Sequence, residues 1–248
     1  MTSKKIIVLN WKMNPLTGKE AITLFKKVKS LAGKNKNTII VAPPMLYLES
    51  IKRAGLGKVK LASQGGAIGD TGAQTGMVSL AMLKKLGASH AILGHSEMRT
   101  QGTTDQEVAE QIKECIAKNI TPILCVGEKE REGDMWYLHA VKSQIELALT
   151  GIPKAKIADV IIAYEPVWAI GKTAKREATV KECEEMAIYI KKVLADMFGN
   201  KDSKKVAIVY GGSVDEKNAH VFLEQGGVDG LLVGRASLNP KQFSAIIN

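Results

Sequence analysis

Short apolar runs recur along the chain, and longer stretches with a different spacing separate them. The runs are rich in β-branched residues and do not alternate between apolar and polar positions, which is typical of strands buried on both faces of a parallel sheet. They lie at residues 6–9, 38–42, 59–62, 91–93, 122–126, 160–163, 206–209 and 231–233. This pattern predicts eight β-strands.

The intervening stretches carry apolar residues at helical spacing. Examples are the sets Ala21, Leu24, Phe25 and Val28; Val108, Ile112, Cys115 and Ile116; and Met186, Ile190, Val193 and Leu194. Strands that alternate with helices at about thirty residues per unit predict an α/β protein, a (β/α)₈ barrel. No Pro/Gly/Ser-rich linker divides the chain, so we expect a single domain over residues 1–248.

A doubly wound open sheet is the alternative architecture for such a pattern. It would place a G-x-G-x-x-G turn directly after the first strand. The chain has Asn10-Trp11-Lys12-Met13-Asn14 at that point, which gives a dinucleotide site no support.

Polar residues follow the predicted strands at their carboxyl ends. Asn10 and Lys12 follow the first strand, His95 and Glu97 the fourth, and Glu165 the sixth. The carboxyl ends of barrel strands form one rim, where barrel enzymes place their catalytic groups. A carboxylate, an imidazole and an ammonium on one rim favour proton abstraction next to a carbonyl group.

Two glycine-rich turns follow the last two strands. Their sequences are Gly211-Gly212-Ser213 and Gly234-Arg235-Ala236-Ser237. Barrel enzymes commonly hold phosphate on backbone N–H groups at these two positions. Ordinary tight turns are the alternative, since glycine is the usual residue wherever φ is positive.

The net charge of +10 does not by itself identify a partner. The lysines are dispersed, aromatic residues make up only 5%, and the sequence gives no basic stripe with interleaved aromatics for a nucleic acid. No apolar run is long enough for a membrane span or a signal peptide. Three cysteines lie far apart without a C-x-x-C pair, so we expect no disulfide scaffold, no metal site and a cytoplasmic location.

The rim motifs occur in an order that resembles the triosephosphate isomerase family from end to end. They lie at residues 10–14, 94–97, 125–128, 163–171, 210–214 and 232–234. The resemblance implies a TIM barrel that interconverts dihydroxyacetone phosphate and D-glyceraldehyde 3-phosphate through an enediolate, in glycolysis and gluconeogenesis. It also implies that no cofactor and no metal take part.

The resemblance further implies a role for each rim residue. Glu165 would be the base, and His95 would polarise the carbonyl as a neutral imidazole. Lys12 would neutralise charge, Asn10 would hydrogen-bond the substrate oxygens, and Glu97 would support Lys12. Backbone N–H groups would hold the phosphate at Gly171, Ser213, Gly234 and Arg235. A loop with Thr75 and Gly76 would brace a partner's active site in a homodimer.

The chain departs from the family pattern at four places. The loop after Gly171 corresponds to the lid of the family. Residues 172–180 differ from the family pattern, and the lid is about two residues longer. We expect it to close, either with residues 175–178 extending the next helix or as a longer loop. Met98 replaces an arginine, and Gln74 and Met77 replace the usual residues of the interface loop. Arg235 stands in the usual glycine pair, which a backbone contact tolerates if its φ is negative.

Two other functions keep the same barrel. A Schiff-base aldolase would need a lysine on the sixth strand, where this chain has Glu165. A non-catalytic barrel would have no need to keep Asn10, Lys12, His95 and Glu165 together.

Overall fold

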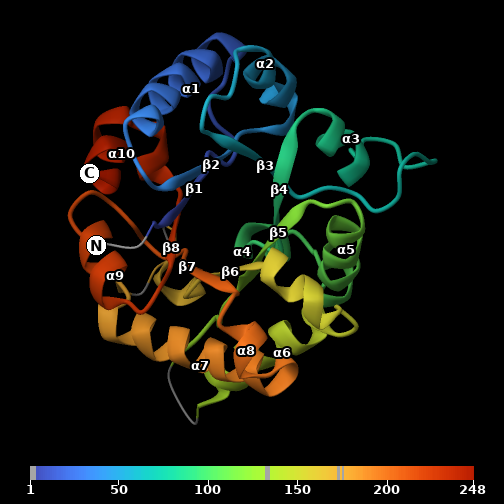
Figure 1. Cartoon of the computed structure of the whole chain (residues 1–248), viewed down its shortest axis with the longest axis vertical. Coiled ribbons are helices and arrows are strands. Elements are labelled where there is room, and N and C mark those ends of the chain that lie inside the picture. Colours follow the sequence, from blue (N-terminus) through green and yellow to red (C-terminus); the bar gives the residue numbers. More distant parts are fainter. Residues whose placement is uncertain (1–3, 132–134, 172–173, 175) are drawn as a thin grey trace.

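Parallel strands form a closed barrel that helices surround (Figure 1). The structure is a computed structural model and describes residues 4–131, 135–171, 174 and 176–248. The strands follow one another around the barrel in chain order, β1-β2-β3-β4-β5-β6-β7-β8. Leu9 on β1 pairs with Val41 on β2 and with Val233 on β8, which closes the ring. The predicted (β/α)₈ fold is confirmed.

The strands coincide closely with the apolar runs of the sequence. Their bounds are β1 (Ile6–Asn10), β2 (Thr38–Ala42), β3 (Lys60–Gln64), β4 (Ala88–Leu93), β5 (Thr121–Val126), β6 (Ile161–Tyr164), β7 (Ala207–Tyr210) and β8 (Gly230–Val233). The fourth strand begins three residues before the predicted start, because Ser89 and His90 interrupt its apolar run. The third ends at Gln64, two residues beyond the predicted end.

Helices follow the strands, and most of them lie around the outside of the barrel. They are α1 (Gly18–Gly33), α2 (Leu48–Arg53), α3 (Leu80–Lys85), α4 (Ser96–Thr100), α5 (Asp105–Ala117), α6 (Trp136–Leu149), α7 (Val180–Phe198), α8 (Asn200–Ser203), α9 (Ala219–Gln225) and α10 (Pro240–Ile247). Unlike most of the others, α4 lies near the centre of the barrel in the view of Figure 1. Short 3₁₀ turns add η1 (Met45–Tyr47), η2 (Lys154–Asp159), η3 (Val167–Ala169) and η4 (Arg235–Leu238). The long helices α1, α5 and α7 each begin with a Thr–Glu capping box, which satisfies the first free N–H groups.

Two apolar layers result from the period of two along each strand. Side chains such as Ile7 and Leu9 point outward and pack with the apolar faces of the helices. Alternate residues point into the barrel and fill it, among them Val8, Ile40 and Ile92. Because the interior is packed with side chains, space for a ligand is left only at the ends of the barrel.

No helix in the described residues combines the length and the apolar character that crossing a membrane requires.

Candidate active site

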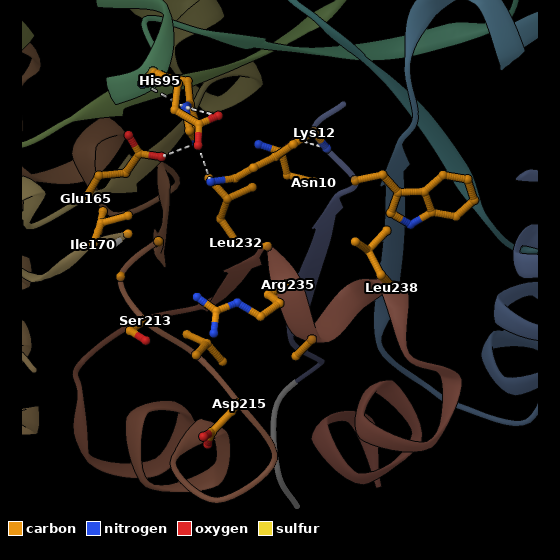
Figure 2. Close-up of a pocket in the computed structure, with 18 of the residues that line it drawn as sticks. Asn10, Lys12, His95, Glu165, Ile170, Ser213, Asp215, Leu232, Arg235 and Leu238 are labelled. Atoms are coloured by element: carbon orange, nitrogen blue, oxygen red, sulfur yellow. Dashed lines mark hydrogen bonds and ion pairs between the residues drawn. The ribbon is translucent and has the colours of Figure 1, made fainter. Parts of the chain in front are cut away.

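A cavity of about 610 Å³ lies at the carboxyl ends of the strands. Its walls come from the segments that follow β1, β4, β6, β7 and β8, as Figure 2 shows for the labelled residues. Asn10, Lys12, His95 and Glu165 meet on one side of it, and Ser213 and Arg235 lie on the other. The structure therefore brings together residues that are far apart in the sequence.

Glu165 directly follows β6 and is only 2% exposed. Its backbone N–H donates to the carbonyl of Val126 at 2.8 Å, which continues the pairing of β6 with β5. The carboxylate accepts a hydrogen bond from the backbone N–H of Ser96 on Oε2 at 2.9 Å. Its other oxygen, Oε1, lies 3.1 Å from Nε2 of His95 but has no aligned hydrogen bond among the described residues. A buried oxygen in that position is available to accept a proton.

His95 caps the first turn of α4 and is 7% exposed. The backbone N–H of Glu97 donates to Nδ1 of the ring at 3.2 Å. A nitrogen that accepts a hydrogen bond carries no proton, so the imidazole is neutral with its proton on Nε2. Nε2 lies beside Glu165 in a ring that lines the cavity, so its N–H can donate to a substrate oxygen.

Lys12 lies in the left-handed region of the backbone, with φ at 53°. Asn10 Oδ1 accepts its N–H at 3.0 Å, and Gln64 Nε2 donates to its carbonyl oxygen at 2.9 Å. These bonds hold a conformation that lysine rarely adopts, and strain of this kind clusters at functional sites. The ammonium forms an ion pair with Glu97 at 2.6 Å and reaches into the cavity.

The glycines of the last two turns allow neighbouring atoms to approach their backbone closely. A Cβ on Gly212 would lie 2.1 Å from the hydroxyl oxygen of Tyr210, and one on Gly211 would lie 3.1 Å from Cγ of Glu165. A Cβ on Gly234 would lie 3.5 Å from Cε of Lys12, so this turn and the ammonium border the same space. The φ of Gly171 is +78°, which disfavours any other residue at the tip of its loop.

Glu128 anchors the start of the segment that follows Glu165. It is 1% exposed and accepts hydrogen bonds from the hydroxyl of Tyr164 at 2.9 Å and from Nε1 of Trp168 at 2.7 Å. Burial raises the pKa of this carboxyl, and these two donors together with nearby Arg131 oppose the shift. Because Tyr164 and Trp168 flank Glu165, their bonds to Glu128 help to fix the position of that residue.

The family model described as triosephosphate isomerase matches residues 5–248. The chain belongs to the triosephosphate isomerase family.

Relatives named triosephosphate isomerase align with nearly the full length of this chain and over nearly the full length of their own. Triosephosphate isomerase of Clostridium acetobutylicum is 40% identical over 98% of this chain and 98% of its own. That of Clostridium novyi is 39% identical over 99% and 98%, and that of Rhodopirellula baltica is 38% identical over 100% and 98%. The resemblance of the rim motifs therefore extends to whole chains.

The residues expected from triosephosphate isomerase motifs fall into two groups in the structure. The catalytic and phosphate candidates line the cavity: Asn10, Lys12, His95, Glu97, Glu165, Gly171, Ser213, Gly234 and Arg235. The interface candidates Thr75 and Gly76 lie apart from it, on the exposed loop between β3 and α3 that extends outward in Figure 1.

Several contributors were not predicted from the sequence. Gln64 donates a hydrogen bond to the backbone of Lys12. It is a polar residue at the carboxyl end of a strand, like the predicted site residues, but the predicted third strand ended two residues before it. The backbone N–H of Ser96 donates to Glu165, and the side chain of Arg131 donates to the hydroxyl of Tyr164. Both contacts join residues that are far apart in the sequence, and no motif indicates them.

The segment after Gly171, for which the sequence predicts a longer lid than in other triosephosphate isomerases, is only partly described, because Lys172, Thr173 and Lys175 lie outside the described residues. The helix after it begins at Val180, with Thr179 as its cap, so residues 176–178 do not extend α7. Arg176 stacks over the ring of Trp168 at 4.4 Å and pairs with Glu182, which links this segment to the helix.

Proposed function

We propose that this chain interconverts dihydroxyacetone phosphate and D-glyceraldehyde 3-phosphate, with Glu165 as the group that moves the proton. The observation that carries the assignment is the facing pair at the mouth of β6. There a buried carboxylate oxygen without a hydrogen bond lies 3.1 Å from the protonated nitrogen of a neutral imidazole. Membership of the triosephosphate isomerase family supplies the substrate.

The reaction follows from these two groups. Glu165 takes the proton from the carbon next to the carbonyl, and the Nε2–H of His95 donates to the carbonyl oxygen as charge develops on it. A proton also passes from the hydroxyl oxygen on the first carbon to the former carbonyl oxygen, and the Nε2–H of His95 lies beside the carboxylate where it can relay this proton. The protonated carboxyl returns its proton to the former carbonyl carbon, which gives the isomer. The Ser96 N–H holds the carboxylate at 2.9 Å, so Glu165 must give up this bond to reach the substrate carbon.

Lys12 and the glycine turns would hold the phosphate. The ammonium borders the turn at Gly234, and the backbone N–H groups of Gly171, Ser213, Gly234 and Arg235 are the proposed donors. Arg235 opens η4 and is not among the residues with positive φ, so the condition for a backbone contact at this position is met. Glu97 pairs with Lys12 and keeps the ammonium at the rim.

A coupled assay of glyceraldehyde 3-phosphate isomerisation, without added metal or cofactor, tests this function. We expect saturable turnover with the purified chain. Cleavage of a sugar bisphosphate instead would indicate an aldolase, and phosphate binding without turnover would indicate a non-catalytic barrel. The described residues contain no group of three or more His, Cys, Asp or Glu side chains that could hold a metal ion.

We also propose a two-fold homodimer in which the loop with Thr75 and Gly76 enters the partner's site. A second cavity of about 210 Å³ opens beside Lys12, between Met13 and Met98. Met13 is 93% exposed and Met77 on the loop is 61% exposed, which favours burial of both in an interface. Light scattering at micromolar concentration should give twice the 26.8 kDa of one chain, and a fully active single chain would refute the dimer.

Residues 1–248 would act as one catalytic unit in the cytoplasm. The three cysteines are free and buried, and burial raises the pKa of Cys115 and of Cys183 to about 12. Buried thiols with such pKa values are unreactive. Their free state supports a reducing compartment.

A further inference from the structure

One arginine differs from the others in its surroundings. The chain has five arginines, and four of them pair with carboxylates. The pairs are Arg53–Glu49, Arg99–Asp105, Arg131–Glu185 and Arg176–Glu182. Within the residues that the structure describes, no carboxylate lies within ion-pair distance of Arg235. A guanidinium without a carboxylate partner is free to bind an anionic ligand.

The position of Arg235 places that guanidinium over the substrate cavity. The residue follows Gly234 directly after β8, and its side chain extends toward the side of the cavity where Ser213 lies (Figure 2). Asp215, which also lines the cavity, accepts backbone N–H groups from Lys217 and Asn218 at 2.8 and 3.1 Å. Among the described residues, the acidic side chains that line the cavity form no ion pair with Arg235; they are Glu97, Glu165, Glu177 and Asp215.

We propose that the side chain of Arg235 binds the substrate phosphate directly, as a second cation beside Lys12. This inference rests on the proposed function and adds a residue to it, because the sequence pattern of the family has glycine at this position and offers only a backbone N–H there. A phosphate ester carries a charge of about −1.5 to −2 at neutral pH. The planar guanidinium matches two of its oxygens with parallel N–H groups, which an ammonium cannot do.

The contact is to a part of the substrate that does not react. It is therefore made equally in the ground state and in the transition state, and its loss raises KM while kcat stays the same. A hydrogen bond to a charged group contributes enough for roughly a tenfold change in affinity when it is partly exposed to solvent. A second cation also makes phosphate binding more sensitive to salt.

The experiment compares the parent chain with Arg235→Gln, using inorganic phosphate as a competitive inhibitor of isomerisation. We expect Arg235→Gln to raise both the inhibition constant of phosphate and KM about tenfold, and to leave kcat within about twofold. Lys27→Gln removes one positive charge from an exposed position on α1 and should leave all three constants unchanged. Arg235→Lys, which keeps the charge but not the planar fork, should raise both affinity constants about threefold.

An inhibition constant and a KM in Arg235→Gln within twofold of the parent would overturn the proposal. A fall in kcat at unchanged KM would also overturn it, since the side chain would then act on the chemistry or on the fold. If Arg235→Gln does not fold, phosphate inhibition of Arg235→Lys decides the matter in the same way. These results are distinct from failure of the proposed function, in which the parent chain itself would show no isomerisation.

Discussion

Gly127 is the position where one added methyl group should disable the catalytic base without touching the cavity. A Cβ at this residue would lie 1.7 Å from the backbone carbonyl oxygen of Glu165 and 2.6 Å from its carbonyl carbon. Real Cβ contacts are essentially never under 3.0 Å. The segments that follow β5 and β6 must therefore move apart by at least 1.3 Å in Gly127→Ala. The contacted atoms are backbone, which cannot rotate away as a side chain can.

The displacement acts directly on the carboxylate. The backbone of Glu165 is held by its N–H bond to Val126 at 2.8 Å, and its carboxylate is held by Ser96 at 2.9 Å. A misplacement of about 1 Å costs on the order of 10²-fold in rate. We therefore expect kcat of Gly127→Ala to fall about 10²-fold, while KM changes less than about threefold because the atoms nearest to the added Cβ all belong to Glu165 and none to a phosphate turn.

The assay is steady-state isomerisation, with circular dichroism to establish that the variant is folded. Gly33→Ala is the matched control, because a Cβ there meets nothing within 4 Å and the residue lies in α1 with no positive φ. It should keep full activity. A folded Gly127→Ala with kcat within threefold of the parent would refute the argument that this contact positions the base.

Three further changes have defined outcomes. Burial, with a smaller effect of Lys60, lowers the pKa of His90 from its usual 6.5 to about 4. Between pH 6.5 and 4, the unfolded chain therefore binds a proton that the folded chain does not. The free energy of unfolding should fall by about 3 kcal/mol as pH falls through this window. Urea titrations of His90→Gln should not show this dependence on pH. Trp168→Phe removes a donor from buried Glu128 and should lower the free energy of unfolding by about 1–3 kcal/mol, whereas an unchanged urea midpoint would contradict the role of this bond. Lys12→Met should lower kcat/KM by about 10²-fold or more, since it leaves the phosphate without the ammonium, and a change below fivefold would count against the assignment.

The barrel could be predicted from the sequence because its strands are buried on both faces. Runs such as residues 39–42 and 122–126 are buried throughout and contain no charged residue, and this signal does not depend on knowing their neighbours. The prediction was wrong only at strand ends. There a polar residue such as His90 is buried in the barrel or, like Gln64, holds a neighbouring segment.

The site could be predicted only as a set of residues on one rim. That His95 accepts a hydrogen bond on Nδ1, and is therefore neutral, depends on the position of a backbone N–H two residues later. The positive φ of Lys12 depends on Gln64, which lies on another strand. Such contacts arise from the closure of the barrel, and a pattern along the chain does not contain them.

The proton transfer by Glu165 is tested most directly by one substitution. Glu165→Gln keeps the size of the side chain and can still meet Ser96, but it cannot accept the proton from the substrate carbon. We expect kcat for glyceraldehyde 3-phosphate isomerisation to fall by at least about 10³-fold, with the inhibition constant of inorganic phosphate within about threefold of the parent. A folded Glu165→Gln variant with kcat within tenfold of the parent would contradict the account.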